Sequence, residues 1–80
     1  MEKAIFYHAG CPVCVEAEKI VAQAIDRNRN ELEIVHFSHH PNRVTEAETA
    51  GVKSVPALVL ENQVFHINFG ASMDDVKAAS

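Results

Sequence analysis

The sequence predicts an α/β fold in which a four-stranded mixed sheet is flanked by helices, with the element order β-α-β-α-β-β-α. A β-α-β unit at the start of the chain predicts two parallel strands joined by a right-handed crossover. Two β-rich segments joined by a short turn near the end predict an antiparallel hairpin. The chain has 80 residues, which fits one domain, so residues 1–80 are expected to fold as a unit.

The first three elements form the β-α-β unit. Lys3–His8 is rich in β-forming residues and is expected to be a strand buried on both faces. Pro12 suits the first turn of a helix, where its missing N–H costs nothing, and apolar residues at helical spacing extend this helix to about Arg27. The polar run 28–30 is expected to end the helix, and Leu32–Ser38 to form the second strand.

Two short helices are expected in the second half of the chain. Arg43–Ala50 is the first of them, with Asn42 as its candidate cap and Gly51 closing it where a left-handed residue is favoured. Ser72 is expected to cap the last helix, whose first turn carries two aspartates that suit the helix dipole, Asp74 and Asp75.

The expected hairpin lies between these two helices. Its strands are Pro56–Leu60 and Val64–Phe69, and Glu61–Gln63 is the turn that joins them. Gly70-Ala71 is expected to break the chain after the fourth strand. Along this strand three apolar side chains alternate, which predicts that they face the core: Phe65, Ile67 and Phe69.

The fourth strand is also expected to be a sheet edge. Its free pairing groups could join a second copy of the chain, so the sequence leaves both a monomer and a homodimer open. His36 and His66 lie on expected strands, where a half-buried or surface position is a commoner role for histidine than that of a ligand.

Charge and hydropathy exclude two classes of partner. The formal net charge is −4 and the seven lysines and arginines do not cluster, whereas a nucleic-acid binder needs a basic stripe. The longest unbroken apolar stretch, Val55–Leu60, is far too short to span a membrane. The first residues do not have the pattern of a secretory signal, so we expect a cytoplasmic protein.

Cys11 and Cys14, in the run Gly10-Cys11-Pro12-Val13-Cys14, indicate a redox-active dithiol, because close cysteines in a reducing cytoplasm are more often catalytic or metal-binding than structural. The helix start favours an anion, which makes Cys11 the expected thiolate nucleophile. Cys14 lies one turn later on the same side and is expected to resolve the mixed disulfide. Pro12 and Val13 carry no charge, so His8 is the nearest ionisable candidate to favour the thiolate, in its protonated form.

Two alternative functions remain open. A metal-binding or carrier module would use Cys11 and Cys14 together with His39 or His40. No second paired motif supplies ligands at a defined spacing, so our main expectation includes no metal. A redox-inactive interaction domain is disfavoured because both cysteines are present.

Two separated motifs resemble a known superfamily. The run Ile5-Phe6-Tyr7-His8-Ala9-Gly10-Cys11-Pro12-Val13-Cys14-Val15-Glu16-Ala17 resembles the opening of a glutaredoxin. The run Gly51-Val52-Lys53-Ser54-Val55-Pro56-Ala57 resembles the segment before the third strand in thioredoxins and glutaredoxins, and Gly70-Ala71 resembles the end of the fourth strand in thioredoxins. The resemblance covers nearly the whole chain and implies a thioredoxin-like fold.

The resemblance also implies roles for single residues. Cys11 matches the attacking cysteine, Cys14 the resolving one, and Pro56 a cis-proline that faces the disulfide. Val55 would offer its backbone groups to an extended substrate strand. The full set of substrate-binding residues implied in this way is Pro12, Val13, Ser54, Val55, Pro56 and Gly70.

The implied activity is thiol–disulfide exchange with a disulfide-containing protein or a small thiol, supported by a reductase that the sequence does not identify. No resident cofactor is expected, and glutathione is a candidate co-substrate. The sequence departs from both subfamilies: it has no tryptophan, and Ile5 stands where thioredoxins carry a buried aspartate. Gly70-Ala71 and Asp74-Asp75 match only loosely the Gly-Gly and Asp-Asp pairs that grip glutathione in glutaredoxins.

Overall fold

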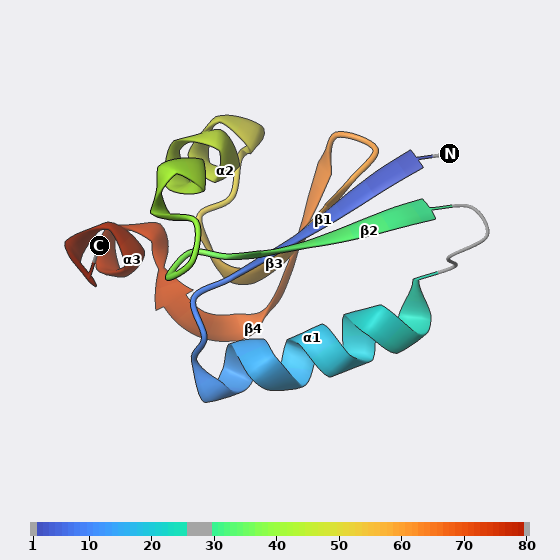
Figure 1. The fold of residues 1–80 in the computed structure, drawn as a ribbon, viewed down its shortest axis with the longest axis horizontal. Helices are drawn as coiled ribbons and strands as arrows, with labels where there is room; N and C mark the ends of the chain where they lie inside the picture. The colour runs from blue at the N-terminus through green and yellow to red at the C-terminus, as the bar shows by residue number, and fades with distance from the viewer. Residues whose placement is uncertain (1, 26–29, 80) are drawn as a thin grey trace.

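The computed structural model describes residues 2–25 and 30–79 and shows one four-stranded sheet with helices on both faces (Figure 1). The elements, in chain order, are β1 (Glu2–His8), α1 (Pro12–Ala24), β2 (Asn30–His36), a 3₁₀ turn (Pro41–Arg43), α2 (Val44–Ala50), β3 (Ser54–Leu60), β4 (Gln63–Ser72) and α3 (Met73–Ala79). This is the expected order β-α-β-α-β-β-α.

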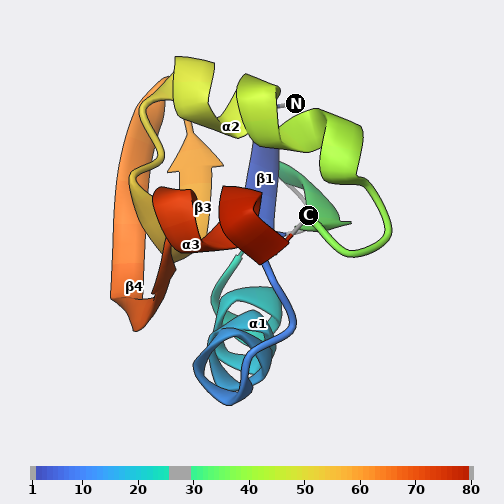
Figure 2. The ribbon, with the colours of Figure 1, turned by 90° about the vertical axis from the view of Figure 1, so that its left-hand side faces the viewer.

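The strands lie in the order β2-β1-β3-β4. β1 pairs with β2 in parallel and with β3 antiparallel, and β3 pairs with β4 antiparallel, so the expected mixed sheet is confirmed. α1 covers one face of the sheet, while α2 and α3 lie together on the other (Figure 2). No helix among the described residues is long and apolar enough to cross a membrane.

Two apolar clusters fill the space between these layers. Ala17 and Val21 of α1 pack with buried residues of the sheet, among them Phe6 and Leu58. The larger cluster joins the opposite face of the sheet to α2 and α3, and it includes Cys14 as one of its buried members. One wall of the expected dithiol site is therefore part of the core.

Some of the expected boundaries are wrong. α1 ends at Ala24 and not near Arg27, because Ile25 already has an extended backbone (φ −73°, ψ 130°) and packs against the cluster under α1. Arg27 and the expected helix end at residues 28–29 lie outside the described residues. β2 runs from Asn30 to His36, two residues earlier than expected, and Phe37 is buried in the turn that follows.

The predicted helix cap at Asn42 is also wrong. A 3₁₀ turn at Pro41–Arg43 leads into α2, and Arg43 occupies the N-cap position without a side-chain cap bond. The side chain of Arg43 instead reaches two carboxylates, as described below. Gly51 closes α2 with φ 104°, as the sequence predicted.

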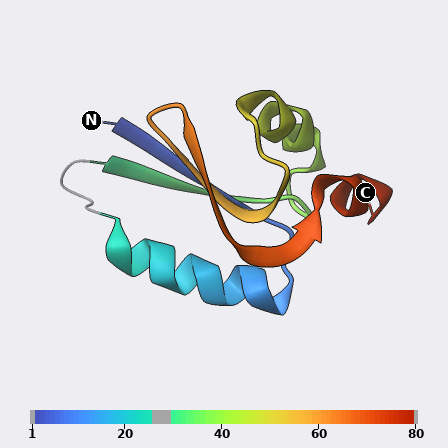
Figure 3. The same cartoon turned by 180° about the vertical axis from the view of Figure 1, so that it is seen from behind.

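β4 is longer than expected, so the predicted break at Gly70-Ala71 is wrong. The pairing of β3 with β4 has an irregularity between Val55 and Ala57, where Pro56 has no N–H to donate, and it then resumes between Val55 and Ala71. Figure 3 shows β4 curving from the hairpin toward α3, past the start of α1. The hairpin turn itself is tight, because Glu61 and Asn62 both have positive φ.

The last helix begins as expected. The Asp75 N–H donates to Ser72 Oγ (3.1 Å), and the Ser72 N–H donates back to Asp75 Oδ2 (3.4 Å), which is a reciprocal helix cap. The prediction that Phe65 faces the core is wrong, since it is 46% exposed, whereas Ile67 packs against the cluster under α1. The side chain of Phe69 lies outside the described residues.

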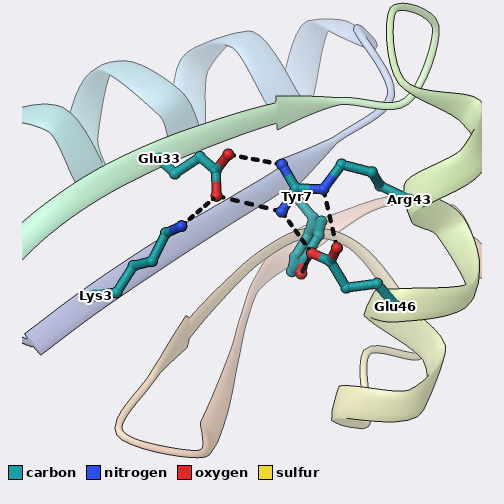
Figure 4. A network of polar contacts seen from close by, with 5 residues as sticks. All are labelled: Lys3, Tyr7, Glu33, Arg43 and Glu46. Carbon is teal, nitrogen blue, oxygen red and sulfur yellow. Dashed lines mark hydrogen bonds and ion pairs between the residues drawn. The ribbon is translucent and has the colours of Figure 1, made fainter.

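A polar network ties β1 and β2 to α2 (Figure 4). Arg43 donates to Glu33 Oε2 and Glu46 Oε2, both at 2.7 Å, and Lys3 Nζ lies 3.1 Å from Glu33. Tyr7 donates its hydroxyl proton to Glu46. The guanidinium of Arg43 holds the pKa of Glu33 at about 2 and also lowers that of Glu46, while burial and the bond to Glu46 raise the pKa of Tyr7.

Candidate functional site

Cys11 caps the N-terminus of α1. Its backbone is extended (φ −70°, ψ 160°), and Pro12 follows in the first turn, where a proline fits because its N–H would have no partner. The Cys14 N–H donates to Cys11 Sγ at 3.2 Å. The sulfur of Cys11 therefore receives a backbone donor at the positive end of a helix, which favours an anionic sulfur there.

The two sulfurs are adjacent. Cys11 Sγ and Cys14 Sγ lie 2.7 Å apart, with Cys11 half-buried and Cys14 completely buried. Burial raises the pKa of the Cys14 thiol, and its hydrogen bond with Cys11 adds to this shift. Cys14 thus keeps its proton near neutral pH, so the half-buried sulfur is the one that can react while the buried one stays protonated behind it.

Gly70 of β4 lies directly against this pair. A Cβ atom built at Gly70 would be 2.5 Å from Cys11 Sγ and 3.3 Å from Cys14 Sγ. The same Cβ would lie 3.0 Å from the Val55 carbonyl oxygen, so the structure brings the dithiol, Gly70 and the start of β3 together. The sequence pattern predicted that Gly70 breaks the chain, and the resemblance implied that it belongs to the substrate-binding residues. The structure continues β4 through Gly70 and places it at the sulfurs.

The peptide bond between Val55 and Pro56 is cis, as the resemblance implied, and both residues are buried. Val55 pairs with Ala71 of β4, and Ser54 pairs with Ser72. Within the motif itself, Pro12 is exposed and Val13 is half-buried. The proposed contacts of these residues with a substrate remain predictions.

His8 does not have the expected charge. It is 4% exposed, its Nδ1 accepts the Gly10 N–H at 3.3 Å, and its Nε2 lies 3.1 Å from Glu18 Oε1. Burial lowers its pKa from 6.5, nearby His36 lowers it further, and Glu18 only partly opposes these effects. His8 is therefore neutral near pH 7, and the expectation that a protonated His8 favours the thiolate is wrong.

Gly10 and His36 also belong to the site, although neither was assigned to it from the sequence pattern. Gly10 has φ 84°, and a Cβ there would lie 2.7 Å from His36 Nε2, so the loop before Cys11 rests on this ring. The His36 ring meets His8 edge-on at 4.4 Å and stacks on His39 at 4.5 Å. The sequence did contain a signal for Gly10, because a glycine directly before a cysteine at a helix start suggests a left-handed residue. It contained no such signal for His36, which lies on a different strand and meets Gly10 only in the folded chain.

The alternative metal module finds no support in the geometry. Within residues 2–25 and 30–79, no three His, Cys, Asp or Glu side chains are grouped as a metal ion would require. His39 stacks on His36, and both His39 and His40 are exposed. The structure thus does not join either histidine to the two cysteines in a ligand set.

Comparison with known proteins agrees with this geometry. The family model described as "Thioredoxin domain" matches residues 1–75. Among solved structures, the chain is similar to a dimeric thioredoxin-like protein from Nitrosomonas europea, determined by NMR in solution, with 63% identity, 95% of each chain covered and a TM-score of 0.87. The comparison with curated proteins found no match. The thioredoxin-like fold implied by the sequence is confirmed.

Proposed function

The chain belongs to the thioredoxin family, and from that premise we propose that it is a thiol–disulfide oxidoreductase in which Cys11 attacks a disulfide and Cys14 resolves the intermediate. The observation that carries this proposal is the 2.7 Å separation of the two sulfurs, one half-buried at a helix N-cap and one fully buried. This is the arrangement that an attacking and a resolving thiol require.

The reaction consists of two exchanges. The Cys11 thiolate attacks a substrate disulfide R–S–S–R′, forms a Cys11–S–S–R mixed disulfide and releases R′S⁻. Cys14 then loses its proton to solvent and attacks the sulfur of Cys11, which forms the Cys11–Cys14 disulfide and releases RS⁻. The substrate gains two electrons, and an external dithiol or pair of thiols returns two electrons to the protein.

The surroundings of the sulfurs support an extended substrate segment. Gly70 presents no side chain beside Cys11, and the sulfur of Cys11 lies where a Cβ would stand, so the backbone of β4 packs directly against the reacting sulfur. Val55 and Pro56 are buried, the Val55 carbonyl lies beside Gly70, and the half-buried Ser54 precedes them on β3. Pro12 and Val13 border the sulfurs from the helix side. A protein disulfide or a small disulfide fits this proposal.

Trapping tests the order of attack. Cys14→Ser is expected to accumulate a mixed disulfide through Cys11 with a model disulfide, because the resolving thiol is gone. Cys11→Ser serves as the matched control and is expected to trap nothing, since the buried Cys14 cannot reach the substrate. Mass spectrometry without reductant reads both variants. Trapping by neither variant, with no Cys11–Cys14 disulfide in the oxidised wild type, would rule the proposal out.

Glutathione is proposed as a co-substrate that returns the electrons, with a dedicated reductase as the other source. Equilibration of the Cys11–Cys14 pair in glutathione redox buffers gives its reduction potential. Rapid reduction by glutathione alone supports the first source. Reduction only in the presence of a flavin-dependent thioredoxin reductase supports the second. We also place the protein in the cytoplasm, where thiols are kept reduced.

A homodimer is proposed on a separate observation. The similar structure is described as dimeric, and here β4 is an edge strand on which Phe65 is 46% exposed. Gln63–Ser72 contains no charged residue, whereas the opposite edge, β2, carries Glu31 and Glu33, and charge protects an edge from pairing. We therefore assign the contact with a second copy to β4.

Sedimentation or light scattering of two matched variants tests this assignment. Phe65→Ser is expected to give a monomer, and Ile34→Ser on the opposite edge is expected to leave the dimer intact, although Ile34 is exposed to a similar degree. A monomeric wild-type protein would refute the dimer, and a dimer that survives Phe65→Ser but not Ile34→Ser would move the interface to β2.

A further inference from the structure

Two histidine side chains contact the loop between β1 and Cys11. The Gly10 N–H donates to His8 Nδ1 at the end of β1, and the Gly10 Cα faces the His36 ring at the end of β2. His8 Nε2 meets Glu18 of α1 at 3.1 Å. His8 thus connects the Ala9–Gly10 peptide, one residue before Cys11, to the helix that Cys11 caps.

Both contacts of His8 require one particular form of its ring. Nδ1 must be without a proton in order to accept from Gly10, and Nε2 must carry the proton in order to donate to Glu18. The neutral Nε2–H tautomer meets both conditions. A doubly protonated ring would place an N–H against the N–H of Gly10, and this contact would be lost.

We propose that His8 is a positioning residue for Cys11, which in its neutral Nε2–H form fixes Gly10 and so holds the sulfur of Cys11 at the helix N-cap. This inference deepens the proposed function, since it concerns the sulfur that makes the attack. Gly10 has a left-handed backbone (φ 84°), and because glycine can adopt many other backbone conformations, its bond to His8 restricts the loop to this one. When the hydrogen bond from the Gly10 N–H to His8 is broken, Cys11 is held less firmly at the helix N-cap. The hydrogen bond from the Cys14 N–H to Cys11 Sγ then weakens.

The inference predicts a pH-dependent loss of Cys11 reactivity at acid pH. The groups that face His8 are Glu18 from α1, His36 from β2 and His39 from the turn after β2. Burial and the two histidines oppose protonation of His8 and Glu18 favours it, so the ring gains its proton below pH 6.5. Removal of the negative charge in Glu18→Gln is expected to move this transition to still lower pH.

Two substitutions separate the contacts of His8. In His8→Asn the side-chain carbonyl stands about where Nδ1 does and can still accept from Gly10, but the side chain no longer reaches Glu18. In His8→Gln the amide reaches toward Glu18 and leaves Gly10 without its acceptor. Neither variant titrates. His40→Asn, at an exposed histidine without a side-chain cap bond, is the matched control.

The readout is the rate of Cys11 alkylation by iodoacetamide from pH 4.5 to pH 8, which needs no disulfide substrate. At pH 7 we expect His8→Asn and His40→Asn to react within twofold of wild type, and His8→Gln to react roughly fivefold more slowly, the factor expected for one hydrogen bond. Wild type and His40→Asn are expected to show the loss of Cys11 reactivity below pH 6.5 that accompanies protonation of His8. Both His8 variants are expected to lack this loss. Equal rates in His8→Asn and His8→Gln would overturn the inference.

A second measurement keeps the inference testable if a variant fails to fold. The ¹⁵N chemical shifts of the His8 ring in the reduced wild-type protein report its tautomer, and the Gly10 amide shift reports the hydrogen bond. The Nε2–H form, with a Gly10 amide that shifts when His8 titrates, supports the inference, whereas the Nδ1–H form refutes it. If neither cysteine variant traps a mixed disulfide and the oxidised wild type forms no Cys11–Cys14 disulfide, the redox proposal fails, while alkylation and NMR still decide the role of His8.

Discussion

Gly70 and Cys11 touch across the gap between the last strand and the first helix: a Cβ atom at Gly70 would lie 2.5 Å from Cys11 Sγ. The two residues are far apart in the sequence and meet because β4 continues two residues past Gly70. Gly70 does not have a positive φ, so a glycine is needed here because the sulfur of Cys11 occupies the place of a side chain, and not because of the backbone conformation.

Gly70→Ala is expected to displace the sulfur of Cys11. Real Cβ atoms do not approach other atoms to 2.5 Å, and the Val55 carbonyl blocks a shift to the other side. We expect the alkylation rate of Cys11 to fall about tenfold and the free energy of unfolding to fall by about 1–3 kcal/mol, as for overpacked sites. Alkylation kinetics and urea denaturation measure the two effects. A wild-type alkylation rate in a folded variant would contradict the contact.

Gly10→Ala is expected to combine two penalties. The backbone at φ 84° costs about 1–2 kcal/mol for a residue with a Cβ, and this Cβ would lie 2.7 Å from the His36 ring. Gly51→Ala is the matched control, since φ is 104° there and its Cβ would meet Val64 only at an ordinary 3.6 Å. Denaturation should show a loss of stability in both variants, while only Gly10→Ala slows alkylation of Cys11. Slowing by Gly51→Ala would show that lost stability alone explains the effect.

The rate of the resolving step, in which Cys14 attacks, is expected to increase with pH up to and beyond the ordinary pKa of a thiol. Burial raises the pKa of Cys14, so its thiolate fraction is small at pH 7 and is still growing above the usual thiol value of 9.0. A mixed disulfide of Cys11 with a chromogenic thiol, prepared in the wild-type protein, gives the release rate by absorbance at each pH. A rate that levels off below pH 8 would contradict the raised pKa.

Stability is expected to fall in acid through the carboxylates bound to Arg43. The pKa values of Glu33 and Glu46 are lowered in the folded state, so their stabilisation is present above pH 4.5 and is lost as the pH falls toward the pKa of about 2 that Glu33 has in the folded protein. Arg43→Gln should remove about 1 kcal/mol at pH 7 and flatten the dependence between pH 4.5 and 2. Urea denaturation at several pH values measures this.

Lys19→Gln is the control for that network, because Lys19 is exposed and its 3.8 Å pair with Glu16 lies between two exposed side chains. It is expected to leave both the stability and its pH dependence unchanged. An identical acid transition in wild type and Arg43→Gln would show that other carboxylates govern the loss of stability.

The sequence predicted the element order, and it predicted that Cys11 and Cys14 lie together at a helix start, because these features depend on local signals. Alternation of apolar residues, the position of Pro12 and the spacing of Cys11 and Cys14 act within a few residues of the chain. The same locality explains the errors. Asn42 has the composition of a helix cap, yet the chain enters α2 through a 3₁₀ turn that leaves Arg43 free to bind Glu33 of β2. Phe65 fits an alternating core pattern, but it lies on an edge strand where one side stays open.

By itself, the sequence determined that two cysteines one helical turn apart follow a strand and begin a helix, and the proposed order of attack rests on this spacing. Tertiary structure alone decided what surrounds them. The continued pairing of β4 places Gly70 at the sulfurs. Burial and the nearby His36 lower the pKa of His8, Glu18 partly opposes this shift, and the His8 Nδ1 accepts the Gly10 N–H. The physical reason is that spacing along a helix is fixed locally, whereas burial and the charge of a histidine depend on residues that only folding brings near.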